Sequence, residues 1–464
     1  MLNEKRIVNL RQLTSQSKWL VASGVVSLLW YLSLFPGRIG SDPVQSLILM
    51  RKGESTDWWT SIYFWFLRLT TFYGQSIWLA SLLSLLVLYL SIIYFLYSFP
   101  EIKKRIEKVA FFICLSPLFG NFAVNINHDI FISAGTLLLV GISLRHYLNS
   151  ETKIDKYVPY FAIFLLMNAK TGYFIILSFL IFQLLSTQRY LKLVSYMGIA
   201  LSIFFLSNFG ITKTPMPMHF LTALADLKCV AQHPEARIST DQWNYLKSLA
   251  PGENWKKPIT CSSMDIAIDK IGSKKLESLD SKEFVKNYFS IASKNPAIVI
   301  EAHLQRGSIA LPPPFFQGPE NQVDQNINNP VGLNTNTALQ LGPIVLHPSI
   351  DDEKLKIHNS VLKTLESLAL LPSFVINQAS WFWGWGGLWL WPIYFYLITR
   401  FRDRSLKRII GVTYPVIITH LVLVLAGPIP APRYVMATIL IGNAATLFLI
   451  SEFMSKTKLG SDTK

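Results

Sequence analysis

The residues with the chemistry of a reactive site stand at the ends of apolar segments. A carboxylate can accept the proton of a hydroxyl group, and a nearby cation can stabilise the negative charge of a leaving phosphate. Ionisable side chains beside a membrane cost free energy, so we treat them as candidates for a functional site. These candidates are Asp42, Asp57, His128, Asp129, Lys170 and Arg433.

The elements that must position these residues are apolar segments, most of them of the 17 to 25 residues that a bilayer crossing requires. Between Trp58 and Tyr73 the sequence is aromatic and amphipathic, which favours a helix lying at the membrane interface. About ten crossing helices are predicted in total. They are Trp19–Phe35, Gln75–Tyr97, Val109–Val124, Ile130–Leu148, Tyr157–Ala169, Gly172–Ser186, Leu193–Gly210, Leu370–Ile398, Ile409–Ala426 and Val435–Phe453.

Composition supports a polytopic membrane protein. The chain has 464 residues, of which 51% are hydrophobic and 15% charged, and its mean hydropathy is +0.35. The formal net charge of +15 resides mainly in short loops between apolar segments. This distribution is typical of cytoplasmic loops and excludes a nucleic-acid-binding face. It predicts that both termini are cytoplasmic and that Asp42 emerges on the outer side.

The fold class predicted is an all-α polytopic membrane protein with a mostly helical extracytoplasmic domain. We expect a transmembrane module at 1–210, the extracytoplasmic domain at 211–365 and a second transmembrane module at 366–464. Within the polar region, apolar residues recur at helical spacing from Asp280 to Gln305. The stretch Pro312 to Pro348 is rich in Pro, Asn and Gln and is predicted to be a long loop.

Two cysteines fall in the polar region, and their state is left open. Cys229 and Cys261 either form a disulfide or remain free thiols. Cys114 lies in an apolar segment and is interpreted as a packing residue. His303 and Arg306 project from the end of the helix expected at Asp280–Gln305. They either bind a pyrophosphate or are ordinary solvated side chains.

Each candidate also has a purely structural interpretation. Asp42 followed by Pro43 and Gln45 fits the N-cap of a helix, and Asp129 could equally cap the segment that follows it, with His128 at the surface. Lys170 and Arg433 could anchor helix ends by reaching toward the headgroups.

Five short motifs resemble the GT-C superfamily of membrane glycosyltransferases. They are Gly40-Ser41-Asp42, the run from Gly53 to Thr60, His128-Asp129, Lys170-Thr171-Gly172 and Pro432-Arg433-Tyr434. Their order along the chain and their shared side of the membrane carry the resemblance. The sequence departs from the family at Trp59, where a histidine is common, and at Lys170, where an arginine is common.

The resemblance implies an inverting enzyme that takes a sugar from a polyprenyl-phosphate donor. Asp42 is then the catalytic base, and Lys170 and Arg433 bind the phosphate. The other expected substrate-binding residues are Asp57, His128, Asp129, His303 and Arg306. Some members of the superfamily hold a divalent metal (Mg, Mn or Ca), for which Asp42 and Asp129 are the candidate ligands.

The resemblance also implies a place of action and partners. The expected location is the plasma (inner) membrane, with the active site on its outer face, where the enzyme contributes to glycan biosynthesis of the cell envelope. The expected partners are the lipid-linked donor, membrane lipid, and a lipid, glycan or protein acceptor. The alternative is a transporter or flippase for a lipid-linked glycan, which favours charges midway along broken helices.

Overall fold

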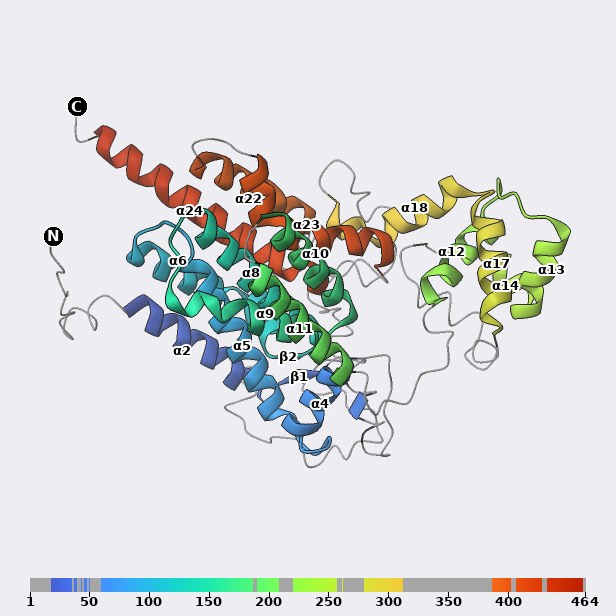
Figure 1. Cartoon of the computed structure of the whole chain (residues 1–464), viewed down its shortest axis with the longest axis horizontal. Coiled ribbons are helices and arrows are strands. Elements are labelled where there is room, and N and C mark those ends of the chain that lie inside the picture. Colours follow the sequence, from blue (N-terminus) through green and yellow to red (C-terminus); the bar gives the residue numbers. More distant parts are fainter. Residues whose placement is uncertain are drawn as a thin grey trace.

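The structure is a computed structural model in which helices make up nearly all of the described chain (Figure 1). It describes residues 18–35, 37–39, 43, 46–47, 50, 60–186, 190–207, 220–256, 261, 279–311, 386–401, 406–427 and 432–461. The expected loop at Pro312–Pro348, the acids Asp42 and Asp57, and the first half of the segment Leu370–Ile398 lie outside these residues.

Most of the helices form one bundle around a single large apolar core. Its helices are α2 (Lys18–Ser33), α4 (Ser61–Thr70), α5 (Trp78–Leu96), α6 (Lys103–Leu115), α7 (Pro117–Ala123), α8 (His128–Tyr147), α9 (Val158–Leu166), α10 (Lys170–Ser186), α11 (Tyr190–Ser207), α22 (Gly386–Arg400), α23 (Leu406–Ala426) and α24 (Met436–Ser461). Two short 3-10 helices belong with them, η1 (Lys153–Lys156) and η6 (Pro432–Val435).

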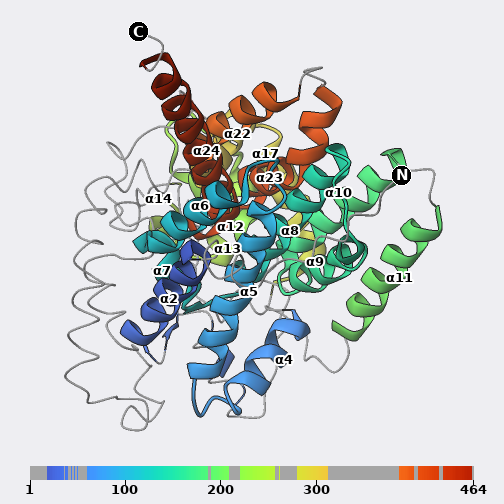
Figure 2. The ribbon, with the colours of Figure 1, turned by 90° about the vertical axis from the view of Figure 1, so that its left-hand side faces the viewer.

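Helix α8 lies at the centre of the bundle, in contact with α5, α9, α23 and α24 (Figure 2). A helix that is apolar on all faces is stable only when other helices cover it, and most of α8 is buried. Small residues let its neighbours approach closely. A Cβ atom added to Gly135 would lie 2.7 Å from Leu166 of α9, and one added to Gly141 would lie 3.1 Å from Tyr94 of α5.

Helices long and apolar enough to cross a membrane are present, in agreement with a helical membrane protein. By length and composition they are Trp78–Leu96, His128–Tyr147, Leu406–Ala426 and Arg433–Met454. Shorter apolar helices cover Lys18–Ser33, Lys170–Leu184 and Lys192–Phe205. The described residues therefore show four such helices, fewer than the ten or so spans expected from the sequence.

One predicted span is broken in two. The segment Val109–Val124 is divided between α6 and α7, because Ser116 adopts an extended conformation directly before Pro117. Proline disfavours a helical conformation in the residue before it and lacks the N–H needed inside a helix, so Pro117 begins α7 instead. The interfacial segment Trp58–Tyr73 contains α4, whose N-cap is Thr60.

Two short strands pair the segment after α2 with the segment before α8. Strand β1 (Arg38–Ile39) pairs in parallel with β2 (Asn125–Ile126), so that Arg38 lies opposite Asn125 and Ile39 opposite Ile126. A hydrogen bond from the Ser81 hydroxyl of α5 to the Val124 carbonyl fixes the chain just before β2. The segment that follows α2 is therefore held beside the segment that leads into α8.

At the opposite end of the bundle from Asp129, ion pairs tie the helix ends together. Arg145 of α8 contacts the Asp155 carboxylate of η1 at 3.2 Å, and Tyr94 of α5 donates a hydrogen bond to the same carboxylate. Arg400 of α22 pairs with Glu101 and with Glu452 of α24. Among the described residues, charge pairs between neighbouring helices therefore hold this end of the bundle together.

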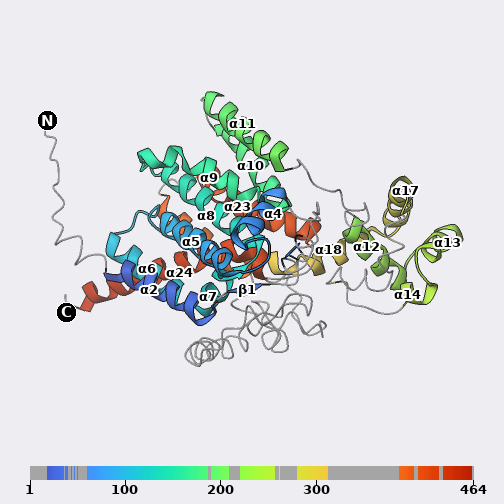
Figure 3. The same cartoon turned by 90° about the horizontal axis from the view of Figure 1, so that it is seen from below.

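A second, smaller group of helices has its own apolar core, centred on Trp255 and Phe284. In Figures 1 and 3 this group lies to one side of the bundle, and its helix α18 runs toward the bundle. The group comprises α12 (Leu221–Gln232), α13 (Thr240–Leu249), α14 (Gly252–Lys256), α17 (Ser281–Ala292) and α18 (Pro296–Arg306), followed by the 3-10 helix η3 (Ser308–Ala310). The described part of the polar region is therefore helical, as predicted.

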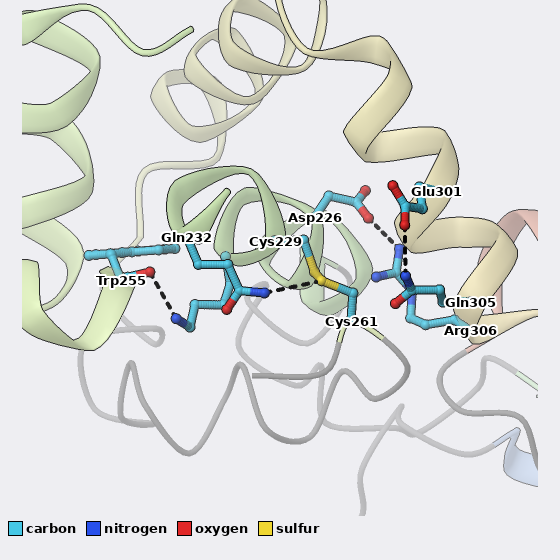
Figure 4. The surroundings of a disulfide bond; sticks show 9 residues. Asp226, Cys229, Gln232, Trp255, Cys261, Glu301, Gln305 and Arg306 are labelled. Atoms are coloured by element: carbon cyan, nitrogen blue, oxygen red, sulfur yellow. Dashed lines mark hydrogen bonds and ion pairs between the residues drawn. A yellow bond between two sulfur atoms is a disulfide. The ribbon is translucent and has the colours of Figure 1, made fainter. Parts of the chain in front are cut away.

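The helix expected from Asp280 to Gln305 is interrupted. Asn295 ends the turn after α17, and Pro296 begins α18. The Asn295 amide bonds the backbone of both Ile291 and Arg237, which holds this turn against the loop before α13. In the same group Cys229 and Cys261 are joined by a disulfide (Figure 4).

Candidate functional site

The candidate site begins at the N-terminus of α8. The side chain of Asn127 accepts a hydrogen bond from the backbone N–H of Asp129, so Asn127 is the N-cap. The alternative that Asp129 caps this helix is therefore wrong. Asp129 instead stands in the first turn, where the partial positive charge of the helix end favours an anion.

The Asp129 side chain is 2% exposed, and two cationic or titratable groups face it. Its Oδ1 lies 3.3 Å from Nε2 of His128, and its Oδ2 lies 3.5 Å from Nε of Arg433. Among the described residues, neither carboxylate oxygen accepts a hydrogen bond. The contacts of the carboxylate with His128 and Arg433 are thus charge contacts rather than hydrogen bonds.

Arg433 reaches this place from η6, far along the chain. Its guanidinium donates a hydrogen bond to the Tyr434 hydroxyl at 2.9 Å and lies over the Tyr434 ring. At the end of η6, Val435 is fully buried against Gly386 of α22, where an added Cβ would lie 2.5 Å from the Val435 side chain. Close packing of α22 therefore sets the position of η6 and of its arginine.

A pocket opens beside Asp129 and Arg433, between α8, α10, α23 and η6. Its polar lining comes from Asp129, Arg433, Tyr434, Thr171 and Thr419. Its apolar wall comes from Ile132, Ile175, Val422 and Leu423. The pocket leaves about 20 Å³ for the centres of water-sized molecules, which is room for about one water. The lining therefore combines a charge pair with an apolar wall.

Lys170 stands at the start of α10, next to this pocket but not in its lining. Its side chain is exposed, whereas that of Thr171 lines the pocket. Gly172 allows the tight connection between α9 and α10, because an added Cβ would lie 1.8 Å from the Leu166 carbonyl oxygen.

His303 and Arg306 are not part of this site. Both contact Asp226 of α12: His303 Nε2 lies 3.1 Å from Oδ2, and the Arg306 guanidinium pairs with Oδ1. Arg306 and Asp226 are each only 1% exposed, so Arg306 is not the solvated residue that the alternative described (Figure 4). Tyr288 also donates to Asp226, which completes a buried cluster within the smaller group.

The sequence alone did not single out three residues that matter here. Thr419 lies within an apolar segment, and nothing in its local pattern marks it as pocket lining. Tyr434 appeared only as part of the motif with Arg433. Asp226 lies one helical turn before Cys229, and this spacing is the signal that could have drawn attention to it.

Asp42 and Asp57 lie outside the described residues. Within the described ranges, no three side chains of histidine, cysteine, aspartate or glutamate gather closely enough to hold a metal ion. At Asp129, moreover, the Arg433 guanidinium occupies the position of a neighbouring cation.

Comparisons of the chain with protein family models, with curated proteins and with solved structures found no match.

Proposed function

We propose that this protein is a membrane glycosyltransferase that transfers a sugar from a polyprenyl-phosphate donor to a hydroxyl group of a lipid, glycan or protein. The observation that carries the proposal is the meeting of Asp129 and Arg433. They come from distant parts of the chain and lie 3.5 Å apart at one pocket, which also has an apolar wall. A lipid phosphate needs both a cation and an apolar surface.

In this proposal Arg433 binds the donor phosphate. In the described conformation the pocket holds about one water, so a phosphate requires the Arg433 side chain to turn toward the mouth. Its side chain is 32% exposed, which leaves it room to do so. Lys170, exposed at the adjacent helix start, supplies a second positive charge.

Asp42 is the proposed base, and the pairing of β1 with β2 supports it. Ile39 lies beside Ile126, and Asp129 begins three residues after Ile126. Asp42 follows Ile39 by the same interval, and three residues of chain span at most about 10 Å. Asp42 and Asp129 thus each follow a residue of this strand pair by three positions in the sequence.

The reaction would be a single displacement. The acceptor oxygen attacks the anomeric carbon while Asp42 takes its proton, and the bond between that carbon and the phosphate oxygen breaks. The electron pair leaves with the phosphate, where Arg433 and Lys170 stabilise its charge. Attack opposite the leaving group inverts the anomeric centre. No acid is needed, because the phosphate leaves without a proton.

The proposed topology places the pocket on the outer face of the plasma membrane. It requires the three shorter apolar helices to cross the membrane as well, which together with the four long helices gives seven of the ten or so spans expected from the sequence. The basic residues at the end of the bundle opposite Asp129, such as Lys103 and Lys153, support a cytoplasmic assignment for that end.

Turnover by purified protein with a panel of polyprenyl-phosphate sugars tests the proposal. Asp42→Asn is expected to lower the rate by about 10²- to 10⁴-fold, the usual contribution of a general base. Arg433→Gln is expected to raise KM as well as lower kcat, because it removes a phosphate ligand.

The matched control is Asp241→Asn, which neutralises an exposed carboxylate in the first turn of α13. It should leave turnover unchanged. If Asp42→Asn retained the rate of the parent protein, the assignment of Asp42 as the base would be wrong. If the parent protein reacted with no donor of the panel, the proposed glycosyltransferase function would be wrong.

A further inference from the structure

A buried histidine joins the smaller helical group to the pocket. His420 lies in α23, directly after the pocket residue Thr419, and is 7% exposed. Its Nδ1 lies 2.6 Å from the carbonyl oxygen of Ala310 in η3, and its Nε2 lies 2.8 Å from the Thr438 hydroxyl of α24. The imidazole of His420, in α23, thus connects this helix to both η3 and α24.

The partners define how the ring is protonated when it is neutral. A carbonyl oxygen only accepts, so Nδ1 carries the hydrogen and donates to Ala310. The Nε2 atom then accepts from the Thr438 hydroxyl. Both ring nitrogens are therefore used, one toward η3, which connects α18 of the smaller helical group to the bundle, and one toward the start of α24.

Each end of this bridge leads to a distinct part of the molecule. Ala310 directly continues α18, whose Arg306 is locked to Asp226 of the smaller group. Gly307 lies against α23, where an added Cβ would be 2.5 Å from the Val424 Cα atom. Thr438 stands just after η6, the element that carries Arg433.

We propose that His420 is a positioning residue that anchors two places independently. Its Nδ1 bond holds η3 and thereby the smaller helical group, and its Nε2 bond holds the junction of η6 and α24 and thereby Arg433 at the pocket. His420 contacts no ligand in this role. It acts through Ala310 and Thr438. The anion-binding half of the proposal rests on the proposed function, whereas the placement of the smaller group does not.

Two substitutions separate the two bonds. In His420→Asn the amide nitrogen takes the place of Nδ1 and can still donate to Ala310, but nothing reaches Thr438. In His420→Gln the amide reaches the place of Nε2 and can still bond Thr438, but the donor to Ala310 is lost. Thr438→Val removes the second bond from the other side with little change of volume.

The matched control is Thr446→Val in the same helix as Thr438. The Thr446 hydroxyl donates to the Gly442 carbonyl within α24. Its removal tests for a general effect of losing a threonine hydroxyl from this helix.

Two measurements report the two anchoring roles, one the placement of the smaller helical group and the other ligand binding at the pocket. Spin labels on cysteines introduced at the exposed positions Gln75 and Lys282 give the distance between the bundle and the smaller group. Native Cys114 is buried and Cys229 is bonded to Cys261, so labelling is confined to the introduced pair. The affinity for farnesyl phosphate, which carries an isoprenoid chain and a phosphate, measures anion binding at the pocket.

We expect His420→Gln to broaden the distance distribution and to leave farnesyl phosphate binding unchanged. We expect His420→Asn and Thr438→Val to weaken binding by about tenfold, the effect of one buried hydrogen bond, and to leave the distances unchanged. The Thr446→Val control should alter neither quantity.

The assignment of one anchoring role to each bond is wrong if the Asn and Gln variants change both measurements alike, if they change neither, or if Thr446→Val has the same effect as Thr438→Val. If the parent protein does not bind farnesyl phosphate, the proposed donor class fails. The spin-label distances then still decide whether His420 seats η3.

Discussion

At the scale of single residues, two buried aspartates meet arginines in different ways. Asp226 and Arg306 are both closed off from solvent, which makes their pair a structural one. Asp129 is buried, but its partner Arg433 is 32% exposed. Arg433 therefore keeps contact with solvent while it pairs with Asp129, which Arg306 in its pair with Asp226 does not.

The Asp129–Arg433 contact predicts a measurable coupling. Asp129→Asn and Arg433→Gln, alone and together, should show an interaction energy of about 0.5–2 kcal/mol, because neighbouring charges in contact do not act independently. Chemical denaturation of the four proteins in detergent gives this energy. Strictly additive effects would show that the two side chains do not interact in solution.

Asp155 predicts a pH-dependent stability. Burial raises its pKa, but hydrogen bonds from the Thr152 backbone and from the side chains of Tyr94 and Thr152, together with the Arg145 charge, outweigh burial and lower the pKa below the usual 3.8. A lowered carboxyl pKa stabilises the fold above the unfolded pKa, and this contribution is lost as pH falls through the folded pKa.

Asp155→Asn should therefore lower the unfolding temperature at about pH 7, and the difference from the parent should shrink below about pH 4. Thermal melts of both proteins across this range test the sign. The exposed Asp241→Asn serves as the reference, with no comparable difference at either pH. A difference in unfolding temperature between Asp155→Asn and the parent that grows on acidification would contradict the lowered pKa of Asp155.

At the scale of elements, helix contacts depend on glycines that have no room for a side chain. Gly307, between α18 and η3, lies against the backbone of Val424 in α23. Its φ of −90° is open to any residue, so the requirement is one of space rather than of backbone conformation. This contact sets how closely α18 approaches the bundle.

Gly307→Ala is expected to destabilise the protein by about 1–3 kcal/mol, because the methyl group must push two backbones apart. Gly198→Ala in α11 is the control, since an added Cβ there meets nothing within 4 Å and alanine favours a helix. Unfolding temperatures of both variants test this. Equal effects would mean that α18 and α23 do not pack as described.

Two helices predicted as continuous from the sequence are each divided into two in the structure. The apolar run Val109–Val124 has the length of a span, but Pro117 divides it into α6 and α7. The run from Asp280 to Gln305 has one helical period, but Pro296 begins a new helix within it. Hydrophobic periodicity predicted helix correctly in both cases, whereas the prolines decided the boundaries.

At the scale of the whole molecule, the described chain has two apolar cores. The smaller one lies among α12, α13, α14 and α17 and is closed by the disulfide Cys229–Cys261, with a sequence separation of 32. A cross-link between residues so far apart restricts the unfolded chain. The smaller group is therefore expected to depend on this bond more than the bundle does.

Replacing both cysteines by serine is expected to cost the smaller group about 3–4 kcal/mol. Calorimetry should show a lowered transition for this group, while the transition of the bundle stays in place. Reduction of the parent protein should reproduce the shift, and Cys114→Ala, which removes the buried thiol, provides the comparison. An unchanged thermogram would argue that the disulfide does not form.

By itself, the sequence determined that the chain is apolar and helical, that the described polar region is helical too, and that His128, Asp129 and Arg433 stand at helix ends. These properties follow from composition and from periodicity over a few turns, which are local. Only the tertiary structure decided that Arg433 meets Asp129 while Arg306 meets Asp226, that Thr419 lines the pocket, and that His420 bonds Ala310 and Thr438. Such pairings depend on how distant helices pack, and no local pattern encodes that packing.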